Sequence, residues 1–366
     1  MLFLSSLAVL SAAEPRAPVD TPLGVPDGFS AIAIDSIGSG RYCVSGFVYD
    51  DAGPSESAYV LLLDANSRQV IWRTLVPHDR GSVSSSATRC LSDDHAYYVI
   101  TQENTNSSES LNQTRVVINK ISDNGNLLRQ KPIEAGFDEW AFLLDVQPDA
   151  ISVGGGTSAT LNRGGQFGTF VEQFDTNLVR TKTIRLDSGA FWTASNARLN
   201  GESLLVAGQF LPNTASLPGR TVFPASKIDL ANRKYVWSSY ASPPDTQQAH
   251  TIFAEEDTTY TVALTATRLS VLMLDHTGKT VSSFSVKKPL CGINALTVDG
   301  RTLKVLGSSC EKESSSVIAV VDMIDKTVVV LRKLDANVSA SQFDGQSWVG
   351  IVTTKTHGQV FRRGAV

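Results

Sequence analysis

Short runs of alternating apolar and polar residues follow one another along most of the chain, and this pattern predicts β-strands. The runs FSAIAIDS (residues 29–36) and RYCVSGFVYD (residues 41–50) are examples. β-Branched and aromatic residues in such runs suit a strand that is buried on one face. No segment of twelve or more residues keeps the i, i+3, i+4 spacing of apolar positions that an amphipathic helix needs. The pattern therefore predicts an all-β fold.

A recurring hairpin pattern divides the chain into units. In each unit an apolar run ends in an acidic residue, a polar turn follows, and a second β-rich run begins. The acidic residues are Asp64, Asp175, Asp229, Asp275 and Asp322, and Ser122 takes this position in one further unit. In chain order the successive spacings are 58, 53, 54, 46 and 47 residues. Asn, Asp and Gly tolerate the left-handed backbone of tight turns, so each match predicts a hairpin.

Two more β-like runs precede each hairpin, which gives four strands per unit, named A to D from the inside outward. Four-stranded units of this length are typical of the blades of a β-propeller. Six units are complete, and residues 338–366 supply three further strands without a strand D. We expect the segment Glu14–Val25 to add the missing outer strand, because its Pro residues suit an edge position and closure removes an exposed edge. The chain is thus predicted to form a single propeller over residues 14–366 with seven blades. Blade counts of six and eight remain as alternatives.

The first thirteen residues, MLFLSSLAVLSAA, are apolar and uncharged and resemble a secretory signal peptide. Ser11 and Ala13 fit a small-residue cleavage site, which would leave Glu14 as the mature start. No Lys or Arg precedes the apolar run, so a buried N-terminal strand is the alternative interpretation. No later stretch is apolar for long enough to predict a transmembrane helix. The expected location is secreted or periplasmic.

Four cysteines allow two disulfides in an exported protein. Cys291 opens strand A of the sixth blade and Cys310 closes its strand B, so antiparallel pairing brings them together. Cys43 and Cys90 fall towards the same face of adjacent blades, where a second disulfide is one reading and free buried thiols are the other. None of the four has C-x-x-C spacing, and no metal site is predicted.

Composition excludes several classes of function. Hydrophobic residues make up 42% of the chain, enough for a large core, and charged residues make up 19%. The formal net charge is −4 and Lys and Arg are scattered, so nucleic acid is not an expected partner.

Two of the hairpins resemble the repeats of pyrroloquinoline-quinone-type propellers. DANSRQVIW ends in Trp72 and IDLANRKYVW ends in Trp237. The repeats of those propellers read as leucine, aspartate, a polar turn, an aliphatic residue and tryptophan. The resemblance implies that Trp packs between blades. It covers these hairpins alone and marks no quinone site, so no cofactor is predicted.

The resemblance also implies that the D-to-A and B-to-C loops form the functional face. We expect the D-to-A loops to carry the residues with binding chemistry: His78, Asp79, Arg80, Asp138, Glu139, Trp140, Phe191, Trp192, His250, Lys287 and Lys288. Aromatic rings, imidazoles, carboxylates and cations around one channel mouth suit a sugar or peptide ligand. Loops are polar in most proteins, however, so these residues could equally be solvated loop positions, and both tryptophans could fill gaps between blades.

The function predicted first is a non-catalytic, exported propeller that binds a protein, a glycan or another envelope component through this face. The alternative is a hydrolase or lyase acting on a sugar, lactone or peptide at the channel mouth, with acid–base chemistry from His78 or His250. A quinone- or metal-assisted oxidoreductase rests on the hairpin resemblance alone. The motifs G-x-S-x-G, H-E-x-x-H and the P-loop do not occur. The sequence therefore leaves open whether the protein is an enzyme.

Overall fold

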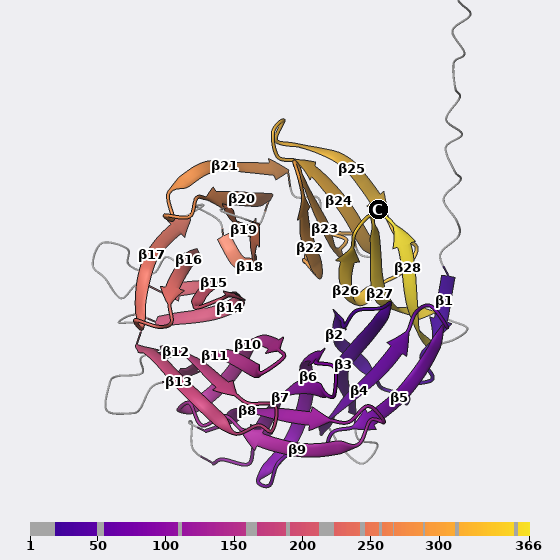
Figure 1. Ribbon diagram of the computed structural model, residues 1–366. Coiled ribbons are helices and arrows are strands. Elements are labelled where there is room, and N and C mark those ends of the chain that lie inside the picture. Colours follow the sequence, from indigo (N-terminus) through magenta and orange to yellow (C-terminus); the bar gives the residue numbers. More distant parts are fainter. Residues whose placement is uncertain are drawn as a thin grey trace, which may run out of the picture.

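The structure is a computed structural model, and every regular element that it describes is a β-strand. It describes residues 19–49, 55–108, 112–158, 167–187, 191–211, 223–241, 246–255, 258–265, 267–287, 290–311, 315–354 and 358–366. The expected signal peptide, residues 1–13, lies outside these ranges. The described strands form seven antiparallel sheets of four strands each. They are arranged in a ring about a common axis (Figure 1), which confirms the predicted seven-bladed propeller. None of the described residues forms a helix of the length and apolarity that a membrane span requires.

The strands of the first four blades follow the chain in order from the channel outward. The first blade comprises β2 (Ser30–Ser36), β3 (Arg41–Tyr49), β4 (Glu56–Asp64) and β5 (Gln69–Leu75). The second comprises β6 (Ser82–Ser92), β7 (Tyr97–Thr105), β8 (Thr114–Ile121) and β9 (Leu127–Pro132). The third comprises β10 (Phe137–Gln147), β11 (Ala150–Ser158), β12 (Phe167–Phe174) and β13 (Arg180–Asp187). The fourth comprises β14 (Phe191–Asn200), β15 (Ser203–Leu211), β16 (Phe223–Asp229) and β17 (Lys234–Ala241).

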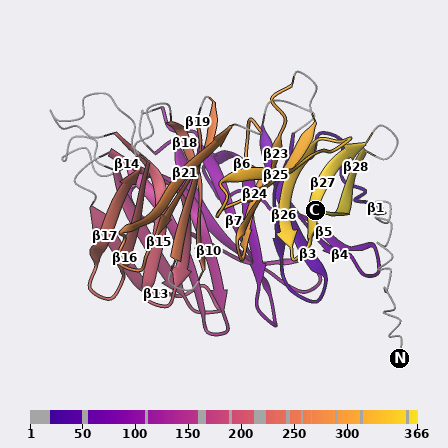
Figure 2. The same cartoon turned by 90° about the horizontal axis from the view of Figure 1, so that it is seen from above.

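The remaining three blades complete the ring. The fifth comprises β18 (Thr246–Glu255), β19 (Thr258–Thr265), β20 (Arg268–Leu274) and β21 (Thr280–Lys287). The sixth comprises β22 (Ala295–Asp299), β23 (Thr302–Ser308), β24 (Ser316–Asp322) and β25 (Thr327–Lys333). The last comprises β26 (Val338–Asp344), β27 (Ser347–Thr354), β28 (Gly358–Ala365) and β1 (Val19–Pro22). Figure 2 shows the ring from the side, with the strands crossing its thickness and the connections at its two faces.

The N-terminal strand closes the ring as predicted. β1 pairs antiparallel with β28, and Asp20 lies opposite Arg362 in the register. The Arg362 guanidinium donates to both Asp20 carboxylate oxygens, at 2.6 and 2.8 Å. The last blade is therefore assembled from both ends of the chain, and the outer edge of β28 is covered.

The repeated acidic residue has a structural role in the C-to-D turns. In the first blade, the Asp64 carboxylate accepts the backbone N–H of Asn66 at 2.8 Å. In the fifth, Asp275 accepts the N–H groups of Thr277 at 2.8 Å and Lys279 at 3.0 Å. Asp175, Asp229 and Asp322 make equivalent bonds, and the hydroxyl of Ser122 accepts the N–H of Asn126. The sequence repeat is thus a repeated side-chain cap on a tight turn.

The hydrophobic cores lie between neighbouring blades. One cluster joins Val262 and Val271 of the fifth blade to Leu303 and Val305 of the sixth. Another joins Trp72 of the first blade to Tyr97 of the second, with their ring centroids 5.1 Å apart. Trp72 therefore packs between blades, as the resemblance of its hairpin implied.

Candidate functional site

The D-to-A loop between β5 and β6 carries His78, Asp79 and Arg80, as predicted, and it is anchored by a buried carboxylate. Glu103 of β7 is fully buried and accepts the backbone N–H of Asp79 with both carboxylate oxygens, each at 3.1 Å. Arg115 of β8 pairs with the Asp79 carboxylate at 3.1 Å and donates to the backbone oxygen of Arg80 at 2.9 Å. Glu103 and Arg115 thus bind the loop backbone, whereas the side chains of His78 and Arg80 are exposed.

Asp138 and Glu139 are adjacent in sequence, but they bind different groups. Asp138 accepts the backbone N–H of Gln113 at 2.6 Å and that of Thr114 at 3.2 Å. Its φ of 28° is compatible with Asp, which tolerates the left-handed region better than most residues. These bonds fasten the end of the connection that leads into β8.

Glu139 is buried and joins the second blade to the third. Its carboxylate accepts the N–H groups of Val116 at 3.2 Å and Gly136 at 3.3 Å, and also that of Ala135. Burial raises the pKa of Glu139 to about 7, while the three backbone donors oppose the rise. The two carboxylates therefore do not face a common point, as a catalytic pair would.

The expected loop positions of several residues are wrong. Asp138, Glu139 and Trp140 lie within β10, Phe191 and Trp192 within β14, and His250 within β18. Each of these innermost strands begins at an earlier residue than the alternation of apolar and polar residues predicts. The reason is that β10, β14 and β18 contain register shifts, which interrupt the two-residue periodicity.

Trp140 packs against its own blade. It lies opposite Gly156 in the register, and a Cβ on Gly156 would lie 2.3 Å from the indole ring. A Cβ on Gly155 would likewise lie 2.3 Å from the backbone oxygen of Trp140. The glycine run at 154–156 thus allows a close contact, and the Trp140 ring is held against β11.

The remaining predicted residues are only partly placed. Lys287 is exposed at the end of β21, on the face of the D-to-A connections. Lys288 and the side chains of Trp192 and His250 lie outside the described part of the structure. The meeting of all predicted residues at one channel mouth therefore stays a prediction.

Both expected disulfides are present, and one of them joins two blades. Cys43 of β3 is bonded to Cys90 of β6, and Cys291 to Cys310. Cys291 and Cys310 lie just outside the strands that we expected to contain them, but the backbone bond from Cys291 N–H to Ser308 O at 2.7 Å continues the pairing of β22 with β23.

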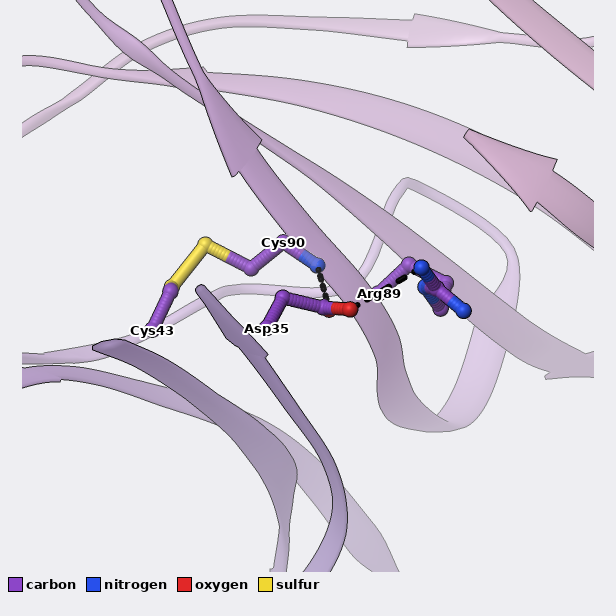
Figure 3. Close-up of a disulfide and its surroundings, with 4 residues drawn as sticks. All are labelled: Asp35, Cys43, Arg89 and Cys90. Carbon is purple, nitrogen blue, oxygen red and sulfur yellow. Dashed lines mark hydrogen bonds and ion pairs between the residues drawn. A yellow bond between two sulfur atoms is a disulfide. The ribbon is translucent and has the colours of Figure 1, made fainter. Parts of the chain in front are cut away.

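An ion pair between a buried Asp35 and a partly exposed Arg89 accompanies the disulfide between blades. Asp35 of β2 lies opposite Cys43 in the register, and its carboxylate accepts the backbone N–H of Cys90 at 3.0 Å. The other carboxylate oxygen pairs with Arg89 at 2.9 Å (Figure 3). Burial raises the pKa of Asp35, and the Arg89 charge opposes this rise. Together these contacts fix the inner edges of the first two blades to each other.

Asp35 and Arg89 line a cavity of about 530 Å³ on the inner side of the ring. Four innermost strands or their leading segments supply its lining. The lining residues are 32–35 from β2, Arg89 from β6, 293–297 from β22 and the residues before it, and 339–343 from β26. These residues form no sequence motif, and they lie in or beside inner strands rather than in the D-to-A loops where binding residues were predicted. The available signal was a charged residue, Asp35 or Arg89, within an inner strand that otherwise carries few charges.

The described residues contain no group of three or more His, Cys, Asp or Glu side chains suited to a metal ion. No family model and no curated protein matches the chain. Among solved structures, that of Sqt1 from Saccharomyces cerevisiae is similar, with 12% identity and a TM-score of 0.54. The match covers 95% of this chain and 84% of that one. At this identity the likeness shows the propeller fold alone, and the resemblance to pyrroloquinoline-quinone-type propellers is not confirmed.

Proposed function

We propose that this protein is an exported β-propeller that serves as a non-catalytic scaffold and binds a protein partner through the face of its D-to-A and B-to-C loops. The observation that carries the proposal is the way in which these loops are held. Glu103 and Glu139 are buried and bind loop backbone, while His78, Arg80 and Lys287 are exposed on the same face. Loops that are ordered before binding lose less entropy on association.

The chemistry of the described loop residues favours a protein over a glycan. Sugar sites commonly offer an accessible aromatic face. Trp140, the candidate aromatic residue whose side chain is described on this face, is half-buried and has its indole ring against Gly156. Exposed cations and an imidazole suit the polar rim of a protein interface.

Export is supported by two features. The N-terminal segment has the pattern of a signal peptide. Two disulfides suit an oxidising compartment, where such bonds persist. The test is N-terminal sequencing of the protein from the exported fraction of its host. A start at Glu14 with four oxidised cysteines supports export, whereas an intact Met1 and free thiols contradict it.

Site-specific photocrosslinking tests the partner and the face together. A crosslinker placed at Arg80 or Lys287 should capture a protein from the exported fraction. The same group at Lys279 should not, because Lys279 is exposed near the other end of β21, on the opposite face. R80E and K287E should weaken the captured complex, and K279E should not. Crosslinks from Lys279 alone, or binding to an immobilised glycan array in place of a protein, would contradict the proposal.

A further inference from the structure

The outer edge of the sixth blade presents a run of exposed apolar side chains. β25 is the outermost strand of its sheet and lies on the perimeter of the ring (Figure 1). It contains four consecutive aliphatic residues, Val328–Leu331. Three residues of this run, Val329, Val330 and Leu331, and Ile324 in the preceding turn are each at least 42% exposed. Among the side chains whose exposure the structure describes, no other outermost strand presents more than two exposed large apolar residues.

β25 also lacks the protection found at other outer edges of the ring. An edge strand exposes unpaired backbone N–H and C=O groups, and natural proteins discourage pairing there with short strands and with charged residues or Pro within the strand. β9 contains Arg129 and Lys131, and β1 ends in Pro22 after four residues. In β25 the charged residues Arg332 and Lys333 come only after the apolar run. The described residues contain no strand beyond β25 in this sheet, so its edge can accept one.

The charges at the two ends of β25 are opposite. Asp325 lies in the turn before the strand, and Arg332 lies near its end, both with exposed side chains. Asp325 lies 3.4 Å from Arg301, and Arg332 donates to a neutral acceptor, the backbone oxygen of Ala365, at 3.3 Å. Exposed contacts of this kind contribute little to stability, so both side chains can bind an opposite charge on another molecule.

A second copy of this chain meets these requirements. When identical edges pair antiparallel about a two-fold axis, the interface is isologous, and the free N–H groups of each strand face free C=O groups of the other. The same arrangement sets the two apolar runs against each other and brings the Asp325 end of one copy to the Arg332 end of the other. In a parallel pair the ends of like charge would meet and repel. Charge complementarity therefore favours antiparallel self-pairing.

We infer that two copies of this protein form a homodimer through antiparallel pairing of their β25 strands. The contact covers the apolar run and removes the free edge from both copies. Because one short strand from each copy forms its centre, the interface is small, and we expect a dissociation constant on the order of 10 µM. β25 lies on the perimeter of the ring rather than on a loop face, so the inference goes beyond the proposed scaffold function and does not depend on it.

The test is sedimentation velocity of the full oxidised chain from about 1 to 300 µM, over which the mass should rise from that of a monomer towards twice that value. Leu331→Lys places a charge in the apolar run of both copies and should weaken the dimer at least about tenfold. Val281→Lys is the matched control, because Val281 is as exposed as Leu331, at 63% against 61%, and lies on β21, the outermost strand of the fifth blade. This variant should dimerise as the native protein does. Circular dichroism and melting of both variants check that they are folded.

Charge reversal tests the antiparallel sense of the pairing. D325K and R332D should each weaken the dimer several-fold, because each sets like charges against one another across the axis. The double variant D325K/R332D reverses both partners and should regain most of the lost affinity. A monomer at all concentrations, native-like dimerisation of a folded L331K, or a double variant weaker than either single variant would overturn the inference. Crosslinking at Arg80 and Lys287 should be unaffected by L331K, so this result stays separate from that of the scaffold proposal.

Discussion

Trp237 of the fourth blade lies directly against Gly278 of the fifth. The indole N–H donates to the backbone oxygen of His276 at 3.1 Å, and a Cβ on Gly278 would lie 2.4 Å from the ring. Trp72 and Gly125 repeat the contact between ring and glycine, though not the indole hydrogen bond, between the first two blades, where the corresponding distance to Trp72 is 3.0 Å. The other described C-to-D turns have Arg68, Leu178, Arg233 or Lys326 at the left-handed position, and the blade before each of them lacks this Trp. Glycine thus occurs where the preceding blade presents a Trp.

Gly278→Ala should destabilise the protein more than an ordinary Gly→Ala change in a turn. Its φ of 81° alone costs an L-residue about 1–2 kcal/mol, and the contact with Trp237 should add about 1–3 kcal/mol. Gly300→Ala is the matched control, because Gly300 has a φ of 54° and no neighbouring atom within 4 Å of the added Cβ. The measurement is denaturant unfolding of both variants.

A double-mutant cycle isolates the contribution of the ring. In a Trp237→Leu background, Gly278→Ala should cost about as much as Gly300→Ala, because the obstruction is removed. An equal cost of Gly278→Ala in both backgrounds would show that backbone conformation explains the whole effect.

Much of the fold follows from local sequence because the turns are local. The Asp64 carboxylate caps an amide two residues away, so the hairpin signal is complete within a few residues. The closing strand could be predicted by counting strands. After six complete blades, three strands remained at the C-terminal end of the chain and one unassigned segment at the N-terminal end. The inter-blade Trp72 contact was expected from the resemblance of its hairpin to a known repeat.

The site was less predictable because its contacts are distant in sequence. Glu139 binds the amide of Val116, which lies 23 residues away on another blade. Asp35 and Cys90 are 55 residues apart, and a register shift beside Arg89 in β6 breaks the alternation from which its direction could be read. The residue types in a loop show which chemical groups are present. They do not show which of these groups already form hydrogen bonds with the backbone.

The two disulfides should differ in their contribution to stability. Cys43–Cys90 links two blades over a sequence separation of 47 residues, whereas Cys291–Cys310 spans 19 residues within one blade. Loop-closure entropy gives about 4 kcal/mol for the first and about 3 kcal/mol for the second. Melting of the C43A/C90A and C291A/C310A variants checks this, and a larger loss in the second variant would contradict it.

The ion pair at the ring closure should contribute measurably. Asp20→Ala should lower the free energy of unfolding by about 1–3 kcal/mol, because Arg362 is 13% exposed and loses two charged hydrogen bonds. Asp335→Ala is the control, since Asp335 contacts the same Arg362 at 3.4 Å but is 90% exposed. Surface pairs of this kind contribute little, so its effect should be small. Equal losses in the two variants would mean that the charge of Arg362, rather than the β1–β28 geometry, determines the effect.

Glu139 should make stability fall as pH rises. Its pKa is about 7 in the folded protein, against an ordinary value of 4.5, so the folded state holds the proton more tightly than the unfolded state between these values. Its contribution is therefore greatest below pH 4.5 and is lost as pH rises through about 7. A difference of this size between the folded and unfolded pKa corresponds to about 3 kcal/mol.

Unfolding free energies of the native protein and of Glu139→Gln, measured from pH 4 to 8.5, isolate this contribution, because all other titrating groups are common to both. The substitution is not structurally neutral, since a glutamine amide has one acceptor oxygen and three backbone N–H groups converge at this position. Glu139→Gln should thus be less stable at low pH, and the difference between the two proteins should shrink as the native carboxyl ionises. A difference that stays constant with pH would show that the three amides hold the carboxylate ionised throughout, with hydrogen bonding outweighing burial.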